Sequence, residues 1–276
     1  MSDLENPKFS EVEDVTEETD ETLNHTDKLV GVFTEPGNTF QRMSTMPSKT
    51  TDWIIPLLIL IIAASLSNFI MMSNPIIKHN MVEKQMTEIE KQFDQMVKEG
   101  KMTEEVKNQQ LDAIQERMDQ GAGMQAVFTV IGIFIISFVS FFIISGVFFL
   151  IIKFLLGGDG NYKNALSAYG LPYYIIVVQI VAMVILALVT DRYFMSTSVA
   201  SIMGLEVNSI TNWLLSRLDV FSIWFYAVIS IGLAKMFKAK NVVPYFATVF
   251  GLWLGFSLVM YFLAQSFPFL KAFAGN

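Results

Sequence analysis

The sequence predicts an all-α, polytopic membrane protein with five transmembrane helices and an extramembrane helical hairpin between the first two. Five apolar stretches contain no Asp, Glu, Lys, Arg or His: residues 54–72, 125–152, 171–190, 220–234 and 242–265. A helix of about 20 apolar residues crosses the ~30 Å hydrocarbon core of a bilayer. The longest polar connection between these stretches carries its apolar residues at helical spacing, which adds the hairpin.

Residues 1–28 form an acidic N-terminal tail. They hold ten acids against Lys8 and Lys28, a net charge of −8, whereas the whole chain carries −7. The few apolar residues of the tail cannot bury enough surface to offset the entropy of ordering, so we expect disorder. A short peptide motif that a basic partner surface recognises is the alternative. The tail lacks the basic region of a secretory signal peptide, so we expect the first span to direct insertion.

Residues 29–53 are predicted to lie at the membrane interface. Pro36 suits the first turn of a helix, and Thr34 is expected to cap that helix. Trp53 is typical of the boundary where a span enters the membrane. We expect apolar side chains to rest on the membrane surface while basic ones face the headgroups: Phe33, Phe40 and Met43, and Arg42 and Lys49.

The hairpin insert is predicted at residues 76–120. Its first arm carries an apolar stripe at alternating spacings of four and three: Val82, Met86, Ile89, Phe93 and Met96. Gly100 ends this arm, Thr103 is placed to cap the second, and a shorter stripe follows at Leu111, Ile114 and Met118. We expect the first two spans to continue beyond the bilayer as these two arms, packed against each other. A partner-binding or dimerising coiled coil is the alternative.

The remaining spans carry a few individual signals. The second span exceeds the bilayer thickness, so we expect tilt or a kink at Gly146. Gln179 is expected to link two helices, and Gly251 and Gly255 to allow close packing within the chain. A short amphipathic helix is predicted along the interface between the third and fourth spans, with one apolar side made of Ile210, Trp213, Leu214 and Leu218.

Several classes of chemistry are disfavoured by the residues present. The chain has no cysteine, and its two histidines, His25 and His79, lie in the tail and the hairpin, away from the serines of the second span (Ser137, Ser140 and Ser145). A serine nucleophile needs a neighbouring base, and a catalytic zinc needs three converging ligands. No basic patch exists for nucleic acid. We therefore expect no enzyme activity, no catalytic, metal or cofactor-binding residues, and no cofactor.

A set of local features, taken in order, resembles a known family. They are Phe33-Thr34-Glu35-Pro36 with Thr39-Phe40, Trp53-Ile54-Ile55-Pro56, Gly157-Gly158 with Tyr162-Lys163-Asn164-Ala165-Leu166, Tyr169-Gly170-Leu171-Pro172, Asp219-Val220-Phe221-Ser222-Ile223-Trp224, and Ile231-Gly232-Leu233-Ala234 with Phe237-Lys238. They resemble the Yip domain family of membrane proteins, named for interaction with Ypt/Rab GTPases, and most of all its prokaryotic branch. The resemblance implies a five-helix membrane domain over residues 54–276 and a cytoplasmic N-terminus. In the eukaryotic branch it implies GTPase recruitment and vesicle traffic.

Together these observations predict a non-catalytic integral membrane scaffold or adaptor, linked to membrane organisation or trafficking. Its partners would be the lipid bilayer and a protein bound through the acidic tail or the hairpin, and homo-oligomers remain open. A bacterial cytoplasmic membrane is the expected location. The alternative function is a facilitative pathway for a small solute or lipid, which needs no buried charge. A water-filled cavity lined by Gln179, Asn68 and the serines of the second span would favour that alternative.

Overall fold

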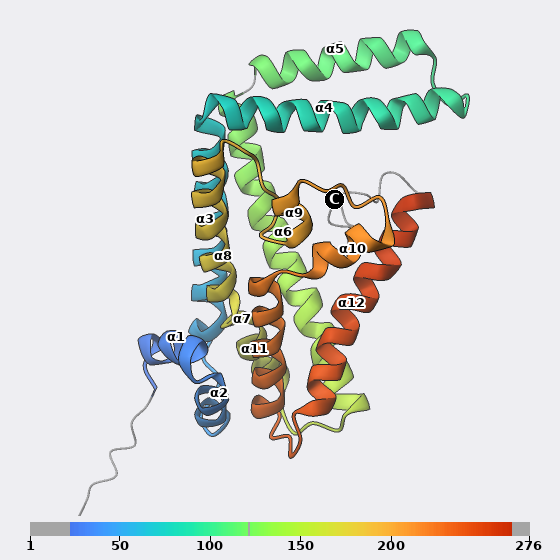
Figure 1. Ribbon diagram of the computed structural model, residues 1–276. Helices are drawn as coiled ribbons and strands as arrows, with labels where there is room; N and C mark the ends of the chain where they lie inside the picture. The colour runs from blue at the N-terminus through green and yellow to red at the C-terminus, as the bar shows by residue number, and fades with distance from the viewer. Residues whose placement is uncertain (1–22, 121, 267–276) are drawn as a thin grey trace, which may run out of the picture.

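The computed structural model describes the backbone of residues 23–120 and 122–266, with side chains for 23–116 and 128–265. Most of the predicted acidic tail lies outside this part of the chain. The regular elements of the described residues are all helices (Figure 1): α1 (His25–Thr34), α2 (Pro36–Ser44), α3 (Thr51–Ser73), α4 (Pro75–Lys98), α5 (Glu104–Gln120), α6 (Ala122–Leu150), the π-helix η1 (Ile151–Leu155), α7 (Tyr162–Gly170), α8 (Tyr173–Thr190), α9 (Val199–Met203), α10 (Ile210–Arg217), α11 (Val220–Met236) and α12 (Val243–Ser266).

Five passes along one axis make up the bundle: α3, α6, α7 with α8, α11 and α12 (Figure 1). Within the described chain, four segments are long and apolar enough to cross a membrane: Thr51–Ser73, Phe128–Leu155, Tyr162–Thr190 and Val243–Gln265. A fifth crossing is obtained if α10 and α11, which are bent by 64° to each other, are taken as one span. The predicted all-α, polytopic membrane fold is therefore confirmed, with four to five spans.

The two ends of the bundle differ in what they carry. Helices α1 and α2 lie at one end, here called the α2 end, and the pair α4–α5 lies at the other, here called the hairpin end (Figure 1). Helix α2 and the last turn of α12 lie at opposite ends of the bundle (Figure 1). This arrangement also separates the two longest polar segments of the described chain.

Helix α1 begins inside the segment predicted as tail. Asn24 caps it by accepting from the backbone N–H of Asp27, whose side chain accepts in return from the N–H of Asn24. Lys28 is buried and its Nζ lies 2.6 Å from Oδ1 of Asp52 at the start of α3. Residues 24–28, which the prediction assigned to the tail, are therefore held on the bundle by this ion pair and the helix cap.

Helix α2 packs against α11 rather than lying on the membrane surface (Figure 1). Phe40 and Met43 are almost fully buried in the protein core, so their predicted exposure to the membrane surface is wrong. Phe33 is half-buried and meets the ring of Trp224 edge-on at 5.5 Å between centroids. The predicted cap is also wrong: Glu35 precedes the helix, and the Thr34 hydroxyl donates to the carbonyl of Val30 instead.

The hairpin is present, but its direction differs from the prediction. Asn74 accepts from the N–H groups of Ile76 and Ile77, and Pro75 opens α4, so the chain turns sharply at the end of α3. As a result α4 and α5 lie side by side across the hairpin end instead of extending the spans (Figure 1). The stripe residues with described side chains are half-buried: Val82, Met86, Ile89, Phe93, Met96, Leu111 and Ile114. Met118 lies outside the described side chains.

The connection between α8 and α11 folds back toward the bundle. Gln179 of α8 donates to Thr197 Oγ1 at 3.0 Å and to Asp219 Oδ2 at 2.9 Å, and Asp219 caps α11. The predicted role of Gln179 as an interhelical link is therefore confirmed. Trp213 is buried and donates from Nε1 to the Ser257 hydroxyl at 3.0 Å. It does not share the exposed side of α10 with Ile210 and Leu214, which corrects the predicted stripe.

Two further expectations for the spans are corrected. Helix α6 continues through Gly146 and changes to a π-helix only at Ile151–Leu155, near its end. A Cβ atom added at Gly251 or Gly255 would meet no atom within 4 Å, so these glycines do not sit at a close helix contact in this chain. Close contacts occur instead at Gly170 and Gly232, because α7 and α11 are the helices that pack against α3 and α2.

Candidate functional site

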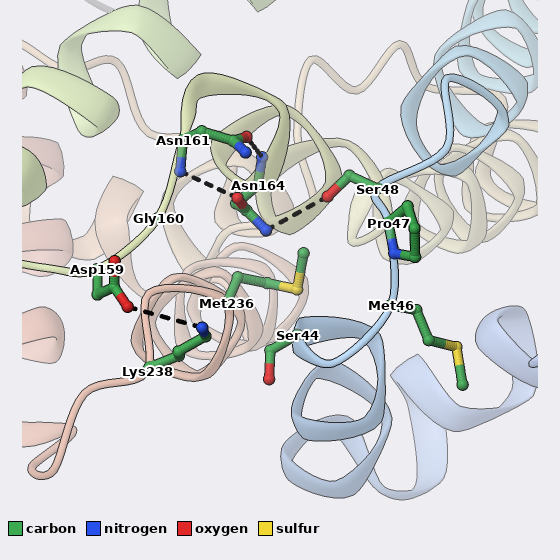
Figure 2. A pocket seen from close by; sticks show the side chains of 10 residues that line it. All are labelled: Ser44, Met46, Pro47, Ser48, Asp159, Gly160, Asn161, Asn164, Met236 and Lys238. Atoms are coloured by element: carbon green, nitrogen blue, oxygen red, sulfur yellow. Dashed lines mark hydrogen bonds and ion pairs between the residues drawn. The ribbon is translucent and has the colours of Figure 1, made fainter.

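A polar hollow of about 370 Å³ opens at the α2 end. It is lined by Ser44, Met46, Pro47, Ser48, Asp159, Gly160, Asn161, Asn164, Met236 and Lys238 (Figure 2). These residues come from the end of α2, the α2–α3 connection, the loop before α7 and the end of α11. Segments far apart in the sequence thus meet here, which makes this hollow the candidate functional site.

The start of α7 forms one wall of the hollow. Asn161 and Asn164 make a reciprocal cap, each side chain accepting from the backbone N–H of the other. Asn164 Nδ2 also donates to the Ser48 hydroxyl at 3.3 Å (Figure 2). One asparagine therefore holds the helix start and ties it to the α2–α3 connection, which fixes two walls of the hollow relative to each other.

The opposite wall joins the loop before α7 to the end of α11. The backbone N–H of Asp159 donates to the carbonyl of Phe237 at 3.0 Å. Lys238 follows in the left-handed region at φ 53°, and its Nζ lies 3.6 Å from Asp159 Oδ2 (Figure 2). Both side chains are more than half exposed, so this ion pair is weak and can exchange with an external charged group.

Two close helix contacts set the position of the walls. A Cβ atom at Gly232 would lie 3.0 Å from the Phe40 ring, so α2 can approach α11 closely only over a glycine. A Cβ atom at Gly170 would lie 2.5 Å from Cβ of Trp53 and 2.7 Å from its Cα. Because backbone cannot yield as a flexible side chain does, α7 and α3 can keep this distance only with glycine at position 170.

A second hollow, of about 570 Å³, lies between α1 and α2, with Asn24, Asp27, Glu35 and Arg42 among its lining residues. Near its rim, His25 Nε2 and the Tyr174 hydroxyl are 2.6 Å apart. Removal from water lowers the pKa of His25, partly offset by the carboxylate of Asp52. Burial thus favours the neutral form of His25, and its contact with Tyr174 holds α1 against α8.

The side chains gathered at the α2 end are hydrogen-bonding and charged groups. Among the described residues no three His, Asp, Glu or Cys side chains are grouped so as to hold a metal ion. The hollow offers hydroxyls, amides, one carboxylate and one ammonium, without a histidine beside a serine. This inventory suits hydrogen bonding and ion pairing with a charged or polar partner.

The sequence prediction named no binding residues, so Ser44, Ser48, Asn161 and Met236 were missed as a group. One signal was available, since Asn161 and Asn164 have the spacing of a helix cap. The meeting of α2 with α7 and α11 depends on tertiary packing, which no local pattern contains. His79, the second histidine, lies far away on the hairpin, exposed and 3.9 Å from Glu83.

Four to five apolar candidate spans and a polar hollow at one end define a polytopic helical membrane protein. The model of the Yip1 domain family matches residues 30–263, and the chain belongs to that family. This match confirms the resemblance to the family, without distinguishing its branches. No curated protein and no solved structure matches the chain.

Proposed function

We propose that this protein is a non-catalytic membrane scaffold or adaptor that presents its α2 end to a protein partner. One observation carries the proposal: residues from almost every family-typical segment meet at this end. Phe40 packs on Gly232, Trp53 packs on Gly170, and Phe237 packs on the loop at Gly158. Asn164 and Lys238 then line the hollow that this packing shapes.

The interior of the bundle supports a scaffold over a solute pathway. Gln179, which would have to line such a pathway, has its amide committed to Thr197 and Asp219. Ser67 donates to the carbonyl of Ala64 in its own helix. Asp219 also accepts from two backbone N–H groups and from the Thr197 hydroxyl, whose single proton is shared between the two carboxylate oxygens at 3.0 and 2.9 Å, so its charge is satisfied locally.

The proposal includes an orientation and a setting. We place the α2 end in the cytoplasm, with the protein in a bacterial inner membrane and in the prokaryotic branch of the family. Support comes from the lysines at the α2 end, since positively charged residues near span ends favour the cytoplasmic side. The acidic tail precedes α1 in the sequence, so we propose it as a second segment for a partner.

Site-specific photo-crosslinking in cells tests the proposal. A photoreactive amino acid at Ser44, in the hollow, should give discrete cross-linked protein species. The same group at the 77% exposed, lipid-facing Val189, or at Gln109 on the hairpin, should not. Discrete species at Gln109 alone would move the partner surface to the hairpin. If no cross-linked species forms at any position and reconstituted vesicles leak solute independently of a gradient, the scaffold proposal is wrong and the facilitative pathway is favoured.

A further inference from the structure

Six lysines lie at or next to helix ends at the α2 end, and we call them the lysine belt: Lys49, Lys153, Lys163, Lys235, Lys238 and Lys240. Each lies where a membrane-crossing helix begins or ends. Lys49 precedes α3, Lys153 lies in the π-helix that completes α6, and Lys163 lies in the first turn of α7. The other three belong to the end of α11 and the loop before α12. The belt therefore lies at the level where spans leave the hydrocarbon.

Few carboxylates of the described residues lie near the belt. Among the described residues, Lys49, Lys163, Lys235 and Lys240 have no carboxylate within 4.0 Å, and Lys238 has only the exposed pair with Asp159. The described acids at this end are few: Asp27, Glu35, Asp52 and Asp159. Of these, Asp52 is already bound to the buried Lys28. Among the described residues, the α2 end thus carries more basic than acidic side chains.

The hairpin end provides a contrast with the same number of lysines. Residues 74–116 hold six lysines against nine acids. Three of these lysines, Lys91, Lys101 and Lys107, form ion pairs with neighbouring carboxylates. The number of lysines therefore does not distinguish the α2 end from the hairpin end. The two ends differ in the position of their lysines relative to the spans and in the number of described acids beside them.

Apolar neighbours show that the belt faces lipid as well as water. Phe154 and Leu155, which follow Lys153, are 79% and 76% exposed, and Val243 just after the loop of Lys240 is 65% exposed. Exposed apolar groups next to lysines at a span end form the arrangement in which the side-chain stem lies in hydrocarbon and the ammonium reaches the headgroups. A soluble acidic partner would not require these apolar neighbours.

We propose that the lysine belt binds the headgroups of anionic phospholipids, and so selects the lipids around the bundle. This lipid-binding proposal rests on the proposed function only through the cytoplasmic placement of the α2 end. In that orientation the belt meets the anionic cytoplasmic leaflet. Anionic headgroups would neutralise the belt without a dedicated pocket. The weak Asp159–Lys238 pair leaves Lys238 free to take part.

Native mass spectrometry of the purified protein tests this with equimolar phosphatidylglycerol and phosphatidylcholine in detergent. The wild-type protein should retain phosphatidylglycerol preferentially, and less so at high salt. The triple variant Lys153→Gln, Lys163→Gln and Lys240→Gln should reduce that preference about tenfold, because each basic residue near an anionic surface contributes to the attraction. The matched control is Lys78→Gln, Lys84→Gln and Lys98→Gln on the hairpin, where the lysines are exposed and lack ion pairs.

The control variant should keep the wild-type preference, as should a belt variant with arginine at the same three positions. If the belt and hairpin glutamine variants lose the phosphatidylglycerol preference equally, the proposal is overturned, because net charge alone would then explain the preference. An unchanged preference in the belt variant would also overturn it. If the glutamine variant fails to fold, single substitution of Lys163 gives the same comparison. Cross-linking at Ser44 is measured separately, so failure of the lipid proposal and failure of the scaffold proposal can be told apart.

Discussion

At the residue scale, the Lys28–Asp52 pair shows how α1 is held. Both side chains are at most 6% exposed, and Asp52 also accepts from the N–H of Lys49. Substitution Lys28→Met leaves a buried carboxylate without its partner, which costs roughly 3–5 kcal/mol where no rearrangement occurs. We expect faster amide exchange throughout α1, measured by mass spectrometry. The double variant with Asp52→Leu should recover much of the protection, and an equal loss in both would show that the ion pair is not what holds the helix.

Substitution of Gly170 tests whether the close contact between α7 and α3 stabilises the protein. Substitution Gly170→Ala places a methyl group 2.5 Å from Cβ of Trp53, so the helices must separate. We expect a loss of at least 1–3 kcal/mol in unfolding free energy, the usual range for overpacking a core. Gly251→Ala is the matched control, because a Cβ there meets nothing within 4 Å and alanine favours a helix. Thermal unfolding in detergent compares the two, and equal midpoints would contradict the contact.

At the scale of elements, the root of the hairpin offers a matched pair of neighbouring isoleucines. Ile77 is fully buried with Met71, Ala187 and Phe194, whereas Ile76 beside it is 53% exposed. Ile77→Ala should cost about 2–4 kcal/mol at this cluster, and Ile76→Ala much less. Amide exchange at the start of α4 is the measurement. Similar exchange in both variants would mean that the cluster does not anchor the hairpin.

The hairpin also shows what the sequence predicts at this scale. The stripe from Val82 to Met96 and the break at Gly100 predict two arms, because helical spacing and a terminating glycine are local properties. The turn at Asn74 was not predicted, although Asn-Pro favours one, because its direction is stabilised by distant groups. Asn74 Nδ2 donates to Asp191 Oδ1, and Lys91 lies 3.7 Å from Glu206.

Helix α2 lies in a different environment from the one that the sequence predicts. Its apolar residues were assigned to the membrane surface because an amphipathic helix next to a span often lies there. The same side chains fit equally well against a protein neighbour, and local periodicity cannot distinguish the two. The absence of a side chain at Gly232 allows Phe40 to pack closely on α11. This contact between distant segments is seen only in the tertiary structure. The candidate site follows from this contact, so the sequence could not predict it as a group.

At the scale of the whole molecule, the number of membrane spans is the property that the sequence predicts most directly. Hydrophobic length predicts the spans well, because the bilayer requires a fixed thickness of apolar helix. The bent pair α10–α11 is harder to predict, since α11 alone has 17 residues and is marginal for a full crossing. Packing of Trp213 on Ser257 holds α10 against α12, so the bend depends on a contact between distant segments.

The orientation can be tested cleanly because the chain contains no cysteine. Lys240→Cys lies in the lysine belt and Gln109→Cys lies on α5 of the hairpin, at opposite ends of the bundle. With the α2 end in the cytoplasm, a membrane-impermeant maleimide added outside intact cells should label position 109 and spare position 240 until the membrane is opened. The physical reason is that lysines near span ends favour the cytoplasmic side of the membrane. All six lysines of the belt lie at span ends, whereas most of the hairpin lysines lie further along α4 and α5. Labelling of position 240 alone in intact cells would reverse the orientation, and labelling of both positions there would contradict the odd number of crossings.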